Sequence, residues 1–268
     1  MAGVTALRRA LARFNQLPLW RHDVDVWDFR MSAVSLDRLV NLQLHRLGWM
    51  NAGIRAFLQR TVQPGMRVVD IGANQGLFTL LLSRLVGPSG RVVAFEPDPE
   101  LFHTLERNCR VNQASNVTLH NLGLSSQAGR LVLYRSLFNA GDNRLAKGLP
   151  EGSFRQELVN VATLDEIAGQ EPIDFIKMDV QGWEWEVVQG MRSALAANST
   201  IRILLEFWPQ GLIRAGCNPQ QLLSHFRQFG FDLCEVGSAD RITDDQAYCR
   251  GFSNERYVDL IATRPSHS

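Results

Sequence analysis

A glycine-containing turn between an acid and a predicted helix is the clearest candidate for ligand chemistry in this sequence. Asp70 ends a run of apolar residues, and Gly72, Asn74 and Gly76 follow it. Glycines let the backbone come close to a ligand, and the first turn of the next helix offers unpaired N–H groups to a carboxylate. We therefore predict that these four residues contact a nucleotide-like ligand.

A second acid completes this predicted site. Glu96, followed by Pro97, ends the next apolar run, where a carboxylate of a Rossmann-like fold accepts hydrogen bonds from ribose hydroxyls. Asn74 stands where a dinucleotide fingerprint has its second glycine, which leaves little room for a pyrophosphate. S-adenosylmethionine (SAM) has a ribose and no phosphate, so we predict SAM as the cofactor. The alternatives are a helix-capping role for Asp70 and a surface position for Glu96.

The end of the third predicted strand supplies candidates for the adenine ring. Asn121 and Leu122 close this strand at 117–122, and ligands of open α/β sheets bind over the carboxyl ends of the strands. We predict that both residues contact the cofactor. For His120, just before them, a solvated strand end is an equally good interpretation.

Two more acids, Asp179 and Glu206, follow later apolar runs at the predicted carboxyl ends of neighbouring strands. Neighbouring parallel strands lie about 4.8 Å apart, so both carboxylates can act on one centre. Methyl transfer to an alcohol needs alignment of the acceptor and removal of its proton. We predict that both residues are catalytic and that Asp179 also lies beside the cofactor.

Simpler interpretations exist for both acids. Asp179 would cap the following helix, and Glu206 would form an ion pair with Lys177 or Arg202. Two carboxylates can also hold a divalent ion that lowers the pKa of an alcohol. We favour a metal-free site, because the sequence has no third carboxylate at clear metal-ligand spacing.

The acceptor is expected to contact aromatic residues and a polar loop near these strand ends. Trp183 and Trp208 are predicted to form walls of the acceptor pocket. The loop that begins at Asn139 continues with Gly141 and then with three predicted acceptor ligands, which are Asp142, Asn143 and Arg144. Arg144 would bind an acidic or polyhydroxylated acceptor, although a solvated turn with an Asp and Arg pair explains the loop equally well.

The elements that position these residues alternate between extended and helical patterns. Strands are predicted at 66–71, 91–95, 117–122, 173–178, 201–207, 231–236 and 257–262, and helices at 78–86, 99–112, 183–197 and 219–229. Such alternation is typical of βαβ units around a parallel sheet. Two further strands, at 130–134 and 157–163, predict a small β insertion around 125–172.

The chain is predicted to have two parts. Apolar residues recur at largely helical spacing between 35 and 60, so residues 1–60 are predicted to form an N-terminal helical cap. Residues 61–268 are predicted to form the SAM-binding domain, including the insertion.

Composition excludes several classes of partner. Lys and Arg number 28 against 27 Asp and Glu, so no strong overall charge attracts nucleic acid or an acidic membrane. The four cysteines form no CxxC pair, which favours reduced thiols and a cytoplasmic location. No apolar run approaches the roughly 20 residues of a membrane-spanning helix. The oligomeric state is left open.

Four sequence segments together resemble the FkbM-type methyltransferases, a family within the class I SAM-dependent group. They are VVDIGANQG at 68–76, VVAFEPDP at 92–99, ATLDEI at 162–167 and IDFIKMDVQGWE at 173–184. The resemblance implies a Rossmann-like core with a mostly parallel seven-stranded sheet and an antiparallel last strand. It also implies O-methylation of a hydroxyl or carboxyl group on a sugar, polyketide or related natural product, with S-adenosylhomocysteine (SAH) as the product. The family commonly has DVEG where this chain has Gln181 in DVQG.

Other functions are less consistent with the sequence. A nicotinamide oxidoreductase needs the missing glycine and a suitable transfer residue. An RNA methyltransferase is opposed by the balanced charge. An RNA or protein methyltransferase and a non-catalytic SAM-binding protein stay as alternatives.

Overall fold

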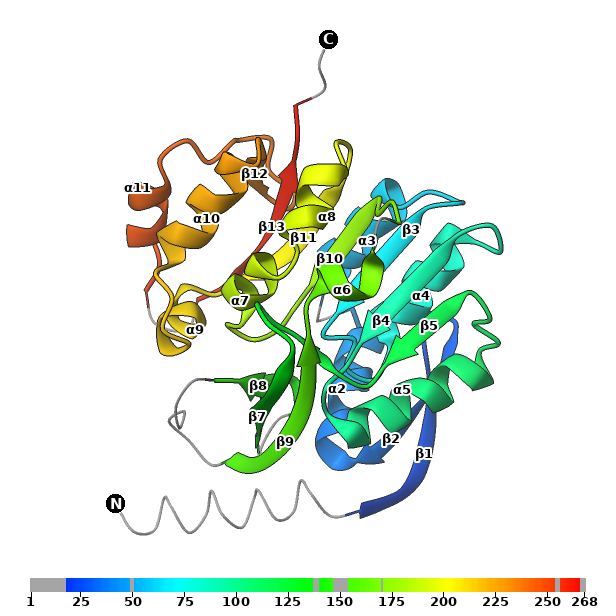
Figure 1. Cartoon of the computed structure of the whole chain (residues 1–268). Helices are drawn as coiled ribbons and strands as arrows, with labels where there is room; N and C mark the ends of the chain where they lie inside the picture. Colours follow the sequence, from blue (N-terminus) through cyan, green and yellow to red (C-terminus); the bar gives the residue numbers. More distant parts are fainter. Residues whose placement is uncertain are drawn as a thin grey trace, which may run out of the picture.

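The computed structural model describes residues 18–48, 51–136, 140–146, 154–169, 171–253 and 256–265. A seven-stranded sheet lies at its centre (Figure 1). In spatial order the strands are β12 (Asp232–Glu235), β13 (Val258–Thr263), β11 (Arg202–Phe207), β10 (Phe175–Met178), β3 (Arg67–Ile71), β4 (Arg91–Phe95) and β5 (Val117–His120). β13 runs antiparallel to both of its neighbours, and the pairs from β11 to β5 are parallel. The predicted sheet is confirmed.

Two hydrophobic cores cover the two faces of this sheet. Successive strand residues point to opposite faces, so Val68 and Phe175 join one core while Val69 and Ile176 join the other. The helices of the sheet are α4 (Leu77–Val86), α5 (Pro99–Val111), α7 (Glu184–Gln189), α8 (Arg192–Ala197), α9 (Pro209–Arg214), α10 (Pro219–Gln228) and α11 (Asp245–Arg250). Helices α4 and α5 pack on the first face, and α7, α8 and α10 on the second.

The helix predicted at 183–197 is divided into α7 and α8. The break falls at Gly190, where an added Cβ would lie 2.0 Å from the Ser125 carbonyl oxygen. A larger residue at position 190 would collide with the insertion, so the position requires glycine. Helix α7 ends at this point.

The predicted insertion is a four-stranded sheet in the order β6 (Gly123–Leu124), β9 (Phe154–Ala162), β7 (Gly129–Ser136) and β8 (Arg144–Leu145), with the short 3₁₀ helix η1 (Ala140–Asp142) before β8. Strands β7 and β9 pair antiparallel along their length, which confirms the predicted hairpin. Helix α6 (Leu164–Ala168) leads back to β10 and begins with a capping box between Thr163 and Glu166.

The prediction of an all-helical N-terminal cap is wrong for residues 18–35. Strands β1 (Pro18–Val26) and β2 (Phe29–Ser35) form an antiparallel hairpin there, and only α2 (Leu36–Arg46) and α3 (Ala52–Thr61) are helical. Residues 1–17 lie outside the described part. Val24, Val26, Phe29 and Met31 are buried at alternate positions on each strand, which is the period of a strand with one face in a core.

The cap packs onto the same core as the first face of the sheet (Figure 1). Ser32 donates its backbone N–H to the Asn108 side chain of α5 at 2.8 Å, and Asn112 contacts the backbone of Arg30. The assignment of 1–60 as a unit separate from 61–268 stays a prediction. Among the described residues, no helix has the length and apolar character needed to cross a membrane.

Candidate active site

A cavity of about 630 Å³ lies over the carboxyl ends of β3, β4, β10 and β11. The turn after β3 and the strand ends form its base, while the insertion and helices α2 and α3 contribute to its walls. Sites for small ligands commonly measure roughly 300 to 1,000 Å³. The volume therefore fits a cofactor of SAM's size together with part of an acceptor.

The glycine turn passes very close to the end of β10. Gly72 has a φ of 81°, and an added Cβ would lie 2.0 Å from the carbonyl oxygen of Asp179. Only glycine fits this approach. Asn74 is also left-handed, with a φ of 53°, which asparagine tolerates better than most side chains. Both residues line the cavity.

Glu96 lies at the cavity with its carboxylate fixed by the backbone. Its two oxygens accept hydrogen bonds from the N–H groups of Asn74 at 2.7 Å and Asp98 at 2.9 Å. Burial raises the pKa of Glu96 to about 8. The neighbouring Pro97 and Leu122 also line the cavity. An acid held in this way beside apolar groups fits a ribose and its adenine.

Asp70 lies beneath the turn. It is fully buried, accepts a hydrogen bond from the Thr79 hydroxyl at 2.7 Å and lies 3.7 Å from the Lys177 ammonium. Burial raises its pKa. Asp70 thus contacts Thr79 of α4 and Lys177 of β10, and it is not among the described residues that line the cavity.

At the other end of the cavity, one side chain joins the two predicted catalytic acids. The Gln181 amide nitrogen donates to Asp179 at 2.7 Å and to Glu206 at 2.9 Å. Lys177 lies 3.6 Å from Asp179, whose side chain is 36% exposed and can be reached from the cavity. The neighbouring strands β10 and β11 thus bring both carboxyl groups to one centre, as predicted from their spacing.

Burial and neighbouring charges shift the pKa values of the ionisable groups at this end of the cavity. Burial, with contributions from Asp179 and Glu184, raises the pKa of Glu206 to about 9. Burial raises the pKa of Asp259, the cross-strand partner of Glu206, to about 6. The pKa of Lys177 is raised. Burial alone would lower it, but the negative charges of nearby acids, chiefly Asp179 and Asp70, have the larger effect. These shifts favour the neutral form of Glu206 and the charged form of Lys177.

Known proteins share this chain's sequence pattern. The methyltransferase FkbM domain matches residues 70–233, from the glycine turn to β12. The chain belongs to the FkbM methyltransferase family. The seven-stranded sheet described above is accordingly the Rossmann-like core of class I SAM-dependent methyltransferases.

Several curated relatives are also similar. Methyltransferase 1 of Beauveria bassiana (strain ARSEF 2860) is 30% identical over 144 residues, which cover 46% of this chain and 57% of that protein. Methyltransferase sdnD of Sordaria araneosa is 29% identical, covering 62% of this chain and 73% of that protein. Hexuronic acid methyltransferase AglP of Haloferax volcanii is 30% identical, covering 57% of this chain and 58% of that protein.

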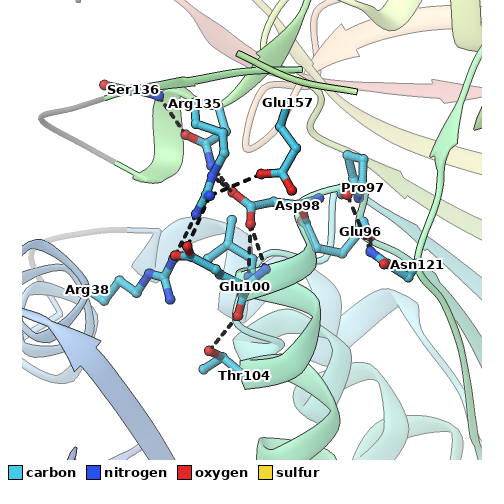
Figure 2. A network of polar contacts seen from close by, with 12 residues as sticks. Arg38, Glu96, Pro97, Asp98, Glu100, Thr104, Asn121, Arg135, Ser136 and Glu157 are labelled. Atoms are coloured by element: carbon cyan, nitrogen blue, oxygen red, sulfur yellow. Dashed lines mark hydrogen bonds and ion pairs between the residues drawn. The ribbon is translucent and has the colours of Figure 1, made fainter. Parts of the chain in front are cut away.

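In this FkbM domain, Asp98 connects Glu96, at one end of the cavity, to the predicted acceptor loop (Figure 2). One of its oxygens caps α5 by accepting the N–H groups of Glu100 and Leu101. The other accepts hydrogen bonds from Arg135 of β7 and Asn143, both at 2.7 Å. Figure 2 shows Arg135 between the acids from α5 and β9, and its guanidinium also contacts Glu100 and Glu157.

The predicted site residues fall into two groups. Those that line the cavity are Gly72, Asn74, Glu96, Pro97, Leu122, Asp142, Asn143, Arg144, Asp179, Trp183, Glu206 and Trp208. Asp70, Gly76 and Asn121 are not among the described lining residues. Asn121 instead donates its amide to the carbonyl oxygens of Glu96 and Pro97. Any ligand contact of these three residues stays a prediction.

Two of the predicted acceptor residues have structural contacts of their own. Trp183 is 2% exposed, and its indole nitrogen donates to the Ser125 hydroxyl at 3.3 Å. Asn143 accepts the backbone N–H of Ser136 in addition to its contact with Asp98. His120 stacks on Phe95 and is not among the described lining residues. Asn139 lies outside the described part.

Sequence reasoning missed several cavity residues as site candidates. Lys177 had a usable signal, because it lies two positions before Asp179 and so on the same side of a strand. The sequence shows Gln181 only as a departure from the family's DVEG, whereas in the structure its backbone has a left-handed φ of 54° and its amide contacts both acids. Arg214, Tyr257 and Asp259 come from elements far away in the sequence and have no local signal. In the described ranges, no group of three or more His, Cys, Asp or Glu side chains is arranged to hold a metal ion.

Proposed function

We propose that this chain transfers the methyl group of SAM to a hydroxyl oxygen of a small-molecule acceptor. The observation that carries the proposal is the shared cavity, which has the fixed Glu96 carboxylate at one end and the bridged Asp179 and Glu206 at the other. SAM would supply a methyl group on a cationic sulfur.

In this proposal Glu96 receives the ribose hydroxyls and the backbone at Gly72 lies against the methionine part of the cofactor. Pro97 and Leu122 border the adenine. The charged Lys177 and the Gln181 amide hold Asp179 in one orientation.

We assign proton removal to Asp179. Glu206 carries its proton at neutral pH, because its pKa is about 9, so it cannot serve as a base there. It supports Asp179 through Gln181. The metal-free character of the reaction is part of the proposal, as is a cytoplasmic location, which the free cysteines at 109, 217, 234 and 249 favour.

The choice of a small acceptor has separate support. One relative is named for a hexuronic acid, which is a hydroxylated small molecule or sugar unit. The net charge of +1 does not favour a nucleic acid. The alternatives are a protein or RNA acceptor and a non-catalytic SAM-binding protein.

Calorimetric titration with SAM, SAH and NADH tests the cofactor directly. Binding of the two adenosyl ligands without NADH is expected. Glu96→Ala should weaken SAH binding by about 1 to 3 kcal/mol through loss of hydrogen bonds to the buried carboxyl group. Glu106→Ala, on the outer part of α5, is the control and should bind SAH as the wild type does. Binding of NADH alone, or an unchanged affinity in Glu96→Ala, would contradict this site.

A further inference from the structure

Two arginines from distant parts of the chain meet at one tryptophan in the wall of the cavity. The guanidinium carbon of Arg144 lies 5.2 Å from the ring centroid of Trp208, and that of Arg214 lies 5.4 Å from it. Arg144 begins β8 in the insertion, whereas Arg214 ends α9 after β11. All three residues line the cavity.

The position of Trp208 is fixed by glycine contacts. A Cβ on Gly211 would lie 2.1 Å from the Trp208 ring, so the indole lies directly against this backbone. Gly211 in turn lies against Gly182, where an added Cβ would be 2.6 Å from the Gly211 carbonyl carbon. Gly182 follows Gln181 in the chain. The indole is therefore held at a set position relative to the bridged acids.

A second feature of Trp208 is its buried indole nitrogen. Trp208 is 8% exposed, and its Nε1 is buried without a hydrogen-bond partner in the part of the chain that is described. Arg144 also lies 5.3 Å from the ring of Phe154 and donates to the Asp142 carbonyl oxygen at 3.3 Å. These contacts hold its guanidinium at the cavity wall.

The charges at this wall favour an anion. Two guanidinium groups lie at this wall, each against the Trp208 ring, and both attract a ligand of opposite charge. The planar guanidinium pairs with a carboxylate, as it does with a phosphate, through two parallel hydrogen bonds.

We propose that the acceptor is a hydroxylated carboxylic acid whose carboxylate binds at Arg144 and Arg214. This inference rests on the proposed methyltransferase function and names its substrate class. A carboxylate paired with two guanidinium groups is a weaker nucleophile than an unpaired carboxylate. It serves as the anchor, and a hydroxyl group of the same molecule is presented to Asp179 for methylation.

The test compares acids with matched neutral compounds on the SAH-loaded protein. Hexuronic acids are paired with the corresponding hexoses, and hydroxybenzoic acids with their carboxamides, and affinities are measured by calorimetry. We expect at least one acid to bind about tenfold more tightly than its neutral counterpart. Arg144→Gln and Arg214→Gln should each lower the affinity for that acid by about tenfold, with little effect on the neutral compound.

Two controls separate this inference from the proposed function. Arg192→Gln removes an exposed arginine of α8 that lies against Phe229 and outside the cavity lining, and it should keep the full preference for the acid. SAH affinity is measured for every variant. Failure of the wild type to bind SAH would overturn the proposed function. Normal SAH binding with no preference for any acid, or a preference that survives both arginine variants, would overturn the carboxylate anchor alone.

Discussion

Gln181 places one amide nitrogen between two carboxyl groups, Asp179 and Glu206, and so joins the two acids. The amide donates to both Asp179 and Glu206, while Lys177 contacts Asp179. A glutamate at this position, as the family commonly has, would bring a third carboxyl group to the same centre. The glutamine therefore adds no further negative charge beside Asp179.

Asp179→Asn is the most direct test of proton removal. The asparagine keeps the size of the side chain but cannot accept the proton of an alcohol. We expect turnover to fall by about 100-fold or more, in the range typical of general bases, while SAH affinity changes less than threefold. An equal loss of turnover and of SAH affinity would make Asp179 a cofactor ligand instead.

Glu206→Gln tests the protonation of the partner acid through stability. A carboxyl group whose pKa is raised from 4.5 to about 9 in the folded protein stabilises the fold fully below its unfolded pKa. This contribution is lost as the pH rises through 9. The free energy of unfolding of the wild type should therefore fall, relative to Glu206→Gln, between about pH 5 and pH 9. Urea titrations across this range measure the difference, and Glu106→Gln should follow the wild type.

At the scale of elements, the sequence predicted the sheet well and the cap poorly. Apolar runs such as 67–71 are typical of strands buried on both faces, and their alternation with helices leaves little freedom in topology. The hairpin of β1 and β2 also has a period-two pattern, but its turn is formed by Trp27 and Asp28, with φ of 51° and 70°. The usual Asn-Gly or Asp-Gly signal is missing there, and the strongly helical pattern beyond residue 35 was extended too far.

The network around Asp98 joins three elements and makes a prediction about stability. The Asp98 side chain is fully buried and that of Arg135 is 12% exposed. Arg135→Met keeps the length of the side chain but leaves a buried carboxylate without its cation. The free energy of unfolding should fall by about 3 kcal/mol, measured by urea denaturation. Arg130→Met, an exposed position on the same strand, should change it by less than about 0.5 kcal/mol.

At the scale of the whole molecule, the site residues predictable from sequence are those at the ends of successive strands. Glu96, Asp179 and Glu206 were found in this way, because parallel strands end at one edge of the sheet. Arg214 and Asp259 were not, because helix α9 and the antiparallel β13 reach the cavity only through long-range packing. The contribution of α2 and α3 to the cavity wall likewise depends on how the cap docks.

The docking of the cap connects it to the cofactor turn. Asn108 of α5 accepts the Ser32 N–H with its side-chain oxygen and donates its amide to the Gln75 carbonyl oxygen at 2.8 Å. Met31 of the hairpin is fully buried in the core that also contains Leu80 and Val92. Because the hairpin and the first face of the sheet share this core, we expect them to unfold together.

Met31→Ala tests this cooperativity. Truncation of a fully buried methionine should lower the free energy of unfolding by about 2 to 5 kcal/mol. Hydrogen exchange followed by mass spectrometry should report the same loss in peptides from β2 and from β4, since both would open in one global step. Val40→Ala, at a position that is 49% exposed, should leave both peptides nearly unchanged. A loss confined to β2 would instead mean that the cap unfolds as a separate unit, as the predicted boundary at residue 60 implies.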